Sequence, residues 1–273
     1  MGFYLYPEPV KYRGMQEKKI RIGAVSYLNT KPLLYGIKRS PLINDIELVE
    51  DHPASIAEML LHDEIDAGLI PVAVIPELAY SRIISDYCIG SDGPVASVCM
   101  FSEVPVNRIQ KVLLDYQSRT SAALLQILLK NYWHISPEIV DTRGEEYRHL
   151  IRDTTAGLVI GDRAFEQRQK STYIYDLGEA WKDHTGLNFV FAAWVANKPL
   201  PEAFIKAFNE ANAMGLSHIP EIIRENPYKL FDLQRYFKYH VNYLLDEKKS
   251  VGMEEFIFQL NQLNNQSPVL LAE

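Results

Sequence analysis

Two rounds of strand, polar turn and helix follow one another along this chain, and this order limits the possible folds more than any other feature. The first round occupies residues 19–37 and the second occupies 109–133. Strands that alternate with helices in this way build α/β layers, in which helices pack on the faces of a largely parallel sheet. The order therefore predicts an α/β fold, and its repetition predicts two similar lobes.

The remaining elements continue the alternation. Apolar stretches predict further strands at 45–50, 66–76, 94–102, 137–143, 156–162 and 189–197, and helices at 54–65 and 145–153, followed by a helical segment from 199 to about 263. An Ala-Gly-Leu sequence occurs in both halves, at 67–69 and at 156–158, which supports the two-lobe interpretation.

The C-terminal helices come too late in the chain to belong to the second lobe, so we expect them to return and cover the first. This places two crossings between the lobes, near 103–108 and 192–197, with one cleft between the lobes. The expected division is an extension at 1–17 outside the fold, lobe 1 at 18–105 plus 196–265, lobe 2 at 106–195, and a tail at 266–273.

Charge and composition narrow the class of protein. The chain has 28 basic and 35 acidic residues, a net charge of −7, which argues against a nucleic-acid protein and against docking on anionic lipid. The N-terminal residues contain no apolar run after a basic patch, and no stretch approaches 18 apolar residues, so we expect a cytoplasmic protein without a membrane span. Cys88 and Cys99 lie in apolar stretches and are expected to be buried free thiols.

Common catalytic motifs are missing from the sequence. It contains no GxxxxGK[ST], no GxGxxG and no GxSxG. The seven histidines show no HxH, HxxxH or HExxH spacing, and there is no CxxC, so we expect no zinc site and no other metal site.

Polar turns at the strand-to-helix junctions are the remaining candidates for a site. SYLNTKP at 26–32 and DYQSRTS at 115–121 occupy equivalent positions in the two rounds. The first turn of a helix presents unpaired N–H groups and a positive dipole end, which bind carboxylates or phosphates. The residues alone thus predict a two-lobed protein that binds an anion in its cleft.

One segment carries a more specific signal. GAVSYLNTKPL at 23–33 resembles the opening signature of the chorismate dehydratases, which begin the futalosine route to menaquinone. Further matches follow in order: DAGLIPVAV (66–74), GPVASVCMFS (93–102), LDYQSRTSAALLQILL (114–129), AGLVIGDRA (156–164) and TGLNFVFAAW (185–194). The resemblance covers about 19–265 and departs at Asn188, where the family usually has proline.

The resemblance implies a fold similar to the type II periplasmic binding proteins, with a ligand cleft between two α/β lobes. It implies a lyase of the hydro-lyase type that converts chorismate to 3-[(1-carboxyvinyl)oxy]benzoate, with no cofactor. Such a reaction needs hydrogen-bond donors at the reacting groups and a cleft that excludes water. Whether the protein is a monomer or a homodimer stays open.

Asn29 and Ser97 match family residues implicated in catalysis. The alternative for Asn29 is a side chain that closes its own turn, and the alternative for Ser97 is a serine packed into a strand. The expected substrate-binding residues lie in the turns and at the ends of strands or helices: Ser26, Tyr27, Thr30, Ser118, Thr120, Ser121, Asp162 and Thr185.

Several of these residues have a second interpretation. One of the three hydroxyl residues before 122 is expected to cap the helix, which leaves Thr120 and Ser121 to contact a substrate carboxylate. Asp162 is a candidate base, a helix cap or a partner for Arg163. Arg119 and Arg163 are candidate carboxylate clamps, with a solvent-facing position as the alternative.

Three rival functions share the expected fold. A solute-binding protein of a transporter is disfavoured by the missing signal sequence and by SYLNTKP. The related 1,4-dihydroxy-6-naphthoate synthase matches the first motif less well, and its histidine chemistry has no counterpart at Asp162. A transcription-factor effector domain is the most distant rival, because no helix-turn-helix region is attached.

Overall fold

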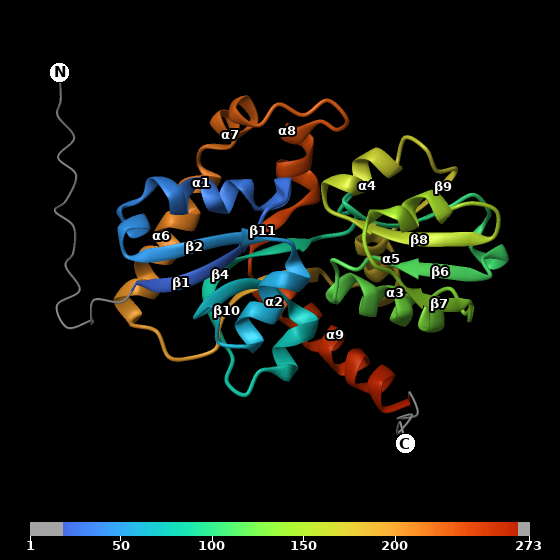
Figure 1. The fold of residues 1–273 in the computed structure, drawn as a ribbon, viewed down its shortest axis with the longest axis horizontal. Helices are drawn as coiled ribbons and strands as arrows, with labels where there is room; N and C mark the ends of the chain where they lie inside the picture. Colours follow the sequence, from blue (N-terminus) through green and yellow to red (C-terminus); the bar gives the residue numbers. More distant parts are fainter. Residues whose placement is uncertain (1–18, 267–273) are drawn as a thin grey trace.

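The computed structural model describes residues 19–266 and shows two α/β lobes side by side (Figure 1). The expected extension at 1–17 and the tail beyond 266 lie outside the described residues. The first lobe contains a sheet in the order β11-β4-β10-β3-β1-β2. Its strands are β1 (Ile20–Val25), β2 (Ile46–Asp51), β3 (Ala67–Pro71), β4 (Arg82–Ser91), β10 (Phe189–Ala196) and β11 (Asn242–Leu244).

The second lobe repeats this arrangement. Its sheet has the order β7-β6-β8-β5-β9, with strands β5 (Val98–Ser102), β6 (Lys111–Leu114), β7 (Glu138–Asp141), β8 (Thr155–Ile160) and β9 (Tyr173–Asp176). In each lobe three parallel strands, β2-β1-β3 or β7-β6-β8, are followed by one antiparallel strand, β10 or β5. The predicted pair of similar lobes is therefore present, and the first sheet has one strand more, β11, at its edge.

Helices cover both faces of the sheets. They are α1 (Lys31–Arg39), α2 (Pro53–Leu61), α3 (Thr120–Asn131), α4 (Asp162–Gln167), α5 (Leu177–Thr185), α6 (Glu202–Leu216), α7 (Ile219–Glu225), α8 (Leu233–Arg235) and α9 (Glu247–Gln266). Short 3-10 helices connect them: η1 (Leu28–Thr30), η2 (Pro41–Asn44), η3 (Val72–Glu77), η4 (Val106–Arg108) and η5 (Glu145–Leu150), and η6 (Tyr236–His240) is a π-helix. Within 19–266 no helix has both the length and the apolar character needed to cross a bilayer.

The Ala-Gly-Leu repeat has a packing reason. Gly68 in β3 lies beside Gly23 of β1, and a Cβ at Gly68 would come within 3.0 Å of the Ile56 side chain of α2. In the equivalent strand β8, a Cβ at Gly157 would come within 2.6 Å of the Ile151 side chain. In each lobe the glycine lets an apolar side chain from the covering layer reach the sheet backbone.

The crossings between the lobes differ from the expected ones. β5 belongs to the second sheet and β10 to the first, so the chain crosses before β5 and again before β10. The expected crossings at 103–108 and 192–197, and with them the boundaries at 105/106 and 195/196, are wrong. Both strands are buried along their whole length, so their apolar composition does not show to which sheet each belongs.

Several other elements differ from expectation. The strands β4, β9 and β11 and the helices α4 and α5 were not expected, and 145–153 forms the 3-10 helix η5 instead of an α-helix. The strand expected at 66–76 ends at Pro71, where η3 begins, and the strand expected at 94–102 begins only at Val98.

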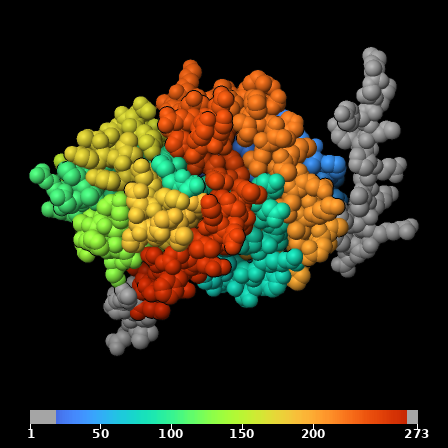
Figure 2. Space-filling view, turned by 180° about the vertical axis from the view of Figure 1, so that it is seen from behind, coloured from blue at the N-terminus to red at the C-terminus, as the bar shows by residue number. Residues whose placement is uncertain are grey.

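The C-terminal segments return to the first lobe as expected and also reach the second. α6 packs on α1, while α9 contacts β10 and η3 of the first lobe and α3 of the second. Figure 2 shows the red C-terminal residues in the middle of the back face, between the yellow and green second lobe and the teal and orange first lobe. Cys88 and Cys99 are buried and free.

Candidate active site

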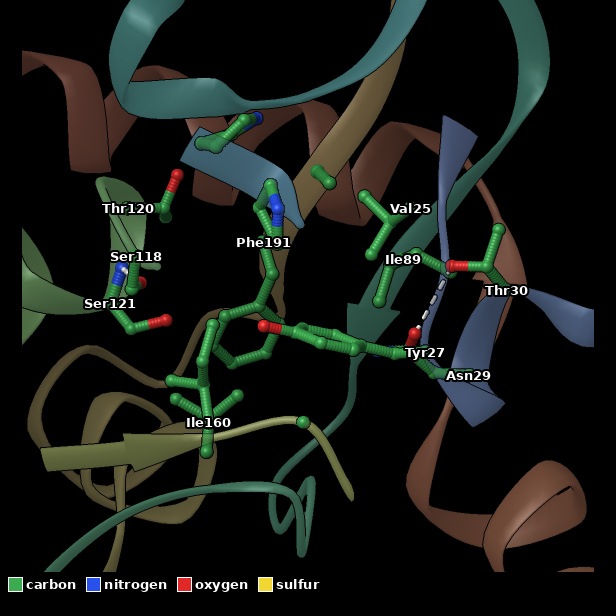
Figure 3. A pocket seen from close by; sticks show the side chains of 15 residues that line it. Val25, Tyr27, Asn29, Thr30, Ile89, Ser118, Thr120, Ser121, Ile160 and Phe191 are labelled. Atoms are coloured by element: carbon green, nitrogen blue, oxygen red, sulfur yellow. Dashed lines mark hydrogen bonds between the residues drawn. The ribbon is translucent and has the colours of Figure 1, made fainter. Parts of the chain in front are cut away.

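A pocket lies between the two sheets and receives side chains from both lobes (Figure 3). We call it the inter-lobe pocket; its empty space, part of which is open to solvent, amounts to about 440 Å³. Its polar lining comes from the two turns that the sequence singled out, one in each lobe. These residues are Tyr27, Asn29 and Thr30 of the first lobe and Ser118, Thr120 and Ser121 of the second.

In the first lobe, the turn between β1 and α1 presents Asn29 and Thr30. Asn29 is held through its backbone, because the buried Tyr243 hydroxyl donates to the Asn29 carbonyl at 2.8 Å. Its side-chain oxygen accepts a hydrogen bond from Thr30 Oγ1 at 3.2 Å, and its Nδ2 group has no hydrogen-bond partner within 19–266. The turn therefore offers one amide donor to a ligand.

In the second lobe, the three hydroxyl residues at the start of α3 have different contacts. Ser118 Oγ accepts the N–H of Ser121 at 3.1 Å and caps the helix. Thr120 Oγ1 accepts the N–H of Ala73, across the cleft, at 3.2 Å and keeps its own proton. The hydroxyl of Ser121 points into the pocket (Figure 3), where the dipole of α3 favours an anion.

Apolar side chains make the walls between these two polar sides. They include Val25, Ile89 and Phe191 from the first lobe and Val98 and Ile160 from the second. Among the described residues that line the pocket, none carries a charge. The pocket thus suits a ligand with an apolar body whose polar groups are recognised by neutral donors.

Several hydrogen bonds cross the cleft and hold the lobes together in a closed arrangement. The Tyr27 hydroxyl bonds to Gln117 Oε1, and the Tyr27 ring lies against Gly161. The N–H of Leu28 donates to the carboxylate of Asp162 at 3.0 Å. Burial raises the pKa of Asp162 to about 6, and burial also raises the pKa of Tyr27, which therefore remains a neutral donor.

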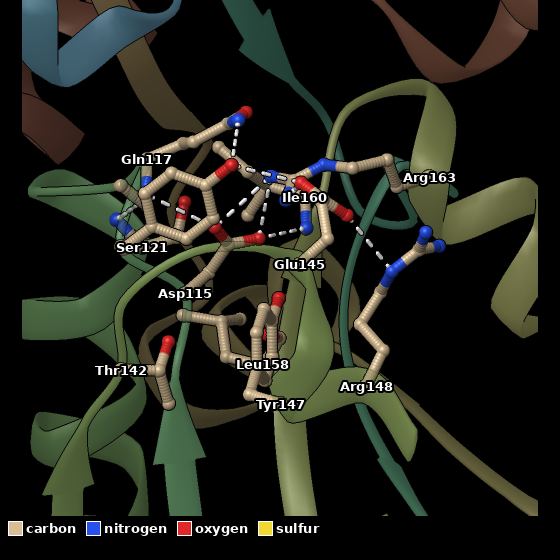
Figure 4. A network of polar contacts seen from close by, with 12 residues as sticks. Asp115, Gln117, Ser121, Thr142, Glu145, Tyr147, Arg148, Leu158, Ile160 and Arg163 are labelled. Carbon is tan, nitrogen blue, oxygen red and sulfur yellow. Dashed lines mark hydrogen bonds and ion pairs between the residues drawn. The ribbon is translucent and has the colours of Figure 1, made fainter.

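Behind the pocket, a network of polar contacts fixes the second lobe's turn (Figure 4). The buried Asp115 carboxylate accepts the N–H groups of Gln117 at 3.0 Å and Ile160 at 2.9 Å. Arg163 pairs with this carboxylate at 2.8 Å and with Glu145 at 2.7 Å. Because Arg163 is committed to these partners, it is not a free clamp for a ligand carboxylate.

Other expected site residues lie outside the pocket lining. Asp162 and Ser97 lie beside it, since their neighbours Gly161 and Val98 line it. Arg119 pairs with Glu58 of the first lobe and is exposed. Ser26 is exposed, and its N–H donates to the Asp51 carbonyl at 3.0 Å.

The structure does not bring Thr185 to the pocket, which corrects the expected cleft contact. Thr185 ends α5, where its hydroxyl donates to the carbonyl of Trp181 at 2.8 Å and accepts the N–H of Leu187 at 3.1 Å. These local bonds satisfy the hydroxyl at the helix end. Asn188, the departure from the family pattern, accepts a hydrogen bond from Lys182 at 2.8 Å.

Sequence reasoning missed the residues that support the turns. Tyr243 is separated from Asn29 by 214 positions and carries no local signal. Gln117 and Asp115 lie inside the DYQSRTS turn, and their polar character next to a helix start was a usable sign. The apolar walls, such as Phe191 and Ile89, are indistinguishable in sequence from ordinary core residues.

Solved structures with the same two-lobe architecture define the class of fold. An Archaeoglobus fulgidus protein matches with a TM-score of 0.72 and 14% identity, over 90% of this chain and 98% of that one. The periplasmic aliphatic sulphonate binding protein of Escherichia coli matches with a TM-score of 0.59 and 16% identity, over 92% and 89%. The fold is therefore that of the periplasmic binding proteins, with a ligand pocket between two lobes, as predicted.

Sequence comparison gives the family. A family model described as menaquinone biosynthesis matches residues 20–261, and the chain belongs to this family. The chorismate dehydratase of Thermus thermophilus is 27% identical over 262 residues, 86% of this chain and 93% of that protein. The chorismate dehydratase of Campylobacter jejuni is 27% identical over 255 residues, 89% and 98%. The resemblance expected from the motifs is confirmed.

Proposed function

We propose that this protein is a chorismate dehydratase, which removes water from chorismate and forms 3-[(1-carboxyvinyl)oxy]benzoate for menaquinone biosynthesis. The observation that carries the proposal is the arrangement of the inter-lobe pocket. Donors of the first lobe and the start of α3 in the second lobe face each other across apolar walls. Chorismate has one carboxylate on its carbon ring and another on the enolpyruvyl ether, and the names of the relatives support the same substrate.

The reaction is a hydro-lyase step that balances without an oxidant. The C–O bond to the ring hydroxyl breaks, and so does the C–H bond on the neighbouring carbon that bears the ether. The C–H electron pair completes the aromatic ring, and the proton and hydroxide leave as water. Aromatisation drives the step, so the protein mainly has to orient the substrate and assist the departing hydroxyl.

The pocket residues have matching roles. The hydroxyls of Thr120 and Ser121, at the positive end of the α3 dipole, bind one carboxylate. Asn29 donates its free amide to the departing oxygen, with Ser97 as a second donor beside the pocket. The cross-lobe bonds of Tyr27 and Asp162 close the cleft and exclude water, which strengthens each of these interactions.

We also propose that the reaction needs no metal and takes place in the cytoplasm. Within 19–266 no three His, Cys, Asp or Glu side chains come together in a metal-binding group. The two buried free thiols fit a reducing compartment.

The test is incubation of the purified, chelator-treated protein with chorismate, followed by mass spectrometry and ultraviolet absorbance. We expect an aromatic product lighter than chorismate by one water. Binding of chorismate without conversion would indicate a solute-binding protein instead. If neither binding nor conversion occurs, the proposed substrate is wrong.

A further inference from the structure

The turn that precedes Ser97 has an unusual backbone. Ala96 has φ +66°, in the left-handed region that residues with a side chain rarely adopt. Such strain persists only where the surroundings force it, and it is concentrated at functional sites.

Two charged side chains force the turn into this shape. The buried carboxylate of Asp176 accepts the N–H groups of Val95 at 3.0 Å and of Ala96 at 2.7 Å. The Arg168 guanidinium donates to the carbonyl of Ala96 at 2.8 Å and lies 3.6 Å from the Asp176 carboxylate. The turn is thus held through its N–H groups and through its carbonyl, and the direction of the Ser97 side chain is fixed with it.

A third contact comes from the C-terminal part of the chain. The Tyr236 hydroxyl lies 2.6 Å from Ser97 Oγ, and both residues are completely buried. Tyr236 begins the π-helix η6, a rare type of turn that is frequent at functional sites. Its ring packs edge-on against Phe165 of α4, with the ring centres 5.0 Å apart.

The chemistry of the two hydroxyls sets the direction of this hydrogen bond. A phenol is a stronger acid than an aliphatic alcohol and is therefore the better donor. Burial raises the pKa of Tyr236, which keeps the phenol protonated. Ser97 Oγ accepts this hydrogen bond, and the hydroxyl proton of Ser97 has no acceptor within the described residues.

Ser97 lies directly behind the pocket wall. Its carbonyl accepts the N–H of Gly161 at 2.9 Å, and both Gly161 and the next residue, Val98, line the inter-lobe pocket. Ser97 is thus joined to the pocket wall through its backbone, by the bond to Gly161 and by the peptide link to Val98.

We propose that Tyr236 is a positioning residue that orients the Ser97 hydroxyl as a donor toward the substrate, on the strained turn held by Asp176 and Arg168. This proposal rests on the proposed function and adds to it a residue that lies 139 positions from Ser97 along the chain. Tyr236 acts through Ser97 and does not touch the substrate.

The test is a double-mutant cycle in turnover, with the variants Tyr236→Phe, Ser97→Ala and the pair. Tyr236→Phe keeps the ring and removes only the hydroxyl, so we expect kcat to fall about tenfold while KM changes less than about twofold. Adding Tyr236→Phe to Ser97→Ala should cost no further turnover, because the orienting bond has lost its target. A purely structural role would not produce this loss of additivity.

The matched control is Tyr175→Phe, which removes a tyrosine hydroxyl that accepts the N–H of Val106 at 2.7 Å. Tyr175 lies on β9, the edge strand of the second sheet, and this variant should keep kcat. An unchanged kcat in Tyr236→Phe, or losses that add in the double variant, overturns the positioning role alone. A wild-type protein that does not convert chorismate overturns the proposed function and the positioning role together.

Discussion

The amide of Asn29 is free for a ligand because other groups hold its turn. The backbone carbonyl of Asn29 accepts the bond from Tyr243, and alanine at this position supplies the same carbonyl. The side chain itself makes one bond, accepted from Thr30 Oγ1 at 3.2 Å. The backbone of Asn29 therefore holds the turn, while its side-chain amide is left for a ligand. A substitution at this position can remove the amide without changing the turn.

We predict that Asn29→Ala lowers kcat about 10²–10³-fold, the usual cost of removing one preorganised donor. The melting temperature should change little. Asn44→Ala is the control, since Asn44 is an exposed asparagine whose amide donates to the Pro41 carbonyl at 3.2 Å. Steady-state kinetics and thermal melts check both variants, and near-normal turnover in Asn29→Ala would show that the residue only forms the turn.

Asp162 makes the stability of the protein depend on pH. Burial raises its pKa from 3.8 to about 6 in the folded state. The folded protein therefore holds this proton between about pH 4 and pH 6, where the unfolded chain has lost it. The stabilisation is complete below the unfolded pKa and is lost as the pH rises through 6, on the order of 3 kcal/mol in all.

We predict that the wild type loses stability relative to Asp162→Asn as the pH rises from about 4 to about 6. Asparagine keeps an oxygen for the N–H of Leu28 and does not titrate. Urea unfolding of both proteins across this range measures the difference. Parallel stability curves would mean that the carboxyl has its ordinary pKa in the fold.

At the scale of secondary-structure elements, two serines at the start of α3 have separate roles. Ser118 accepts the N–H of Ser121 at 3.1 Å and so completes the helix. Ser121 directs its hydroxyl into the pocket (Figure 3). The same short segment therefore serves folding and binding through separate side chains.

We predict opposite effects for the two serines. Ser118→Ala should lower the free energy of unfolding by about 1 kcal/mol, as loss of a helix cap does. Ser121→Ala should leave stability nearly unchanged and weaken product binding about tenfold or more, because a bond to a charged group is worth about 1.5–3 kcal/mol. Chemical unfolding measures the stability of both variants, and product titration measures their affinity. If binding survives in Ser121→Ala, the anion is held elsewhere.

The whole molecule is described with its cleft closed. Bonds from Tyr27, Leu28 and Ala73 of the first lobe reach Gln117, Asp162 and Thr120 of the second. Each is a single hydrogen bond that contributes about 1 kcal/mol net to the closed state. The loss of one bond is therefore enough to shift the balance between closed and open lobes.

We predict that Tyr27→Phe favours the open state about fivefold, which corresponds to the loss of about 1 kcal/mol. Small-angle scattering of the ligand-free variant should give a larger radius of gyration than the wild type, and added product should reverse the change. Tyr35→Phe is the control, since the Tyr35 ring stacks on His218, away from the cleft. Equal radii for Tyr27→Phe and the wild type would show that this bond does not hold the lobes.

Local sequence determined the class of fold and the two turns of the site. Strand and helix periodicity is a property of neighbouring residues, and so is the chemistry of a helix start, which singled out the turns of Asn29 and Ser121 that line the pocket. Tertiary structure alone decided where the chain crosses between lobes, because β5 and β10 are apolar strands that fit either sheet. It also decided that Thr185 bonds within its own helix end, and that Tyr243 and Tyr236 support Asn29 and Ser97. Those pairs are 214 and 139 positions apart, and only the strand order of the folded chain brings them together.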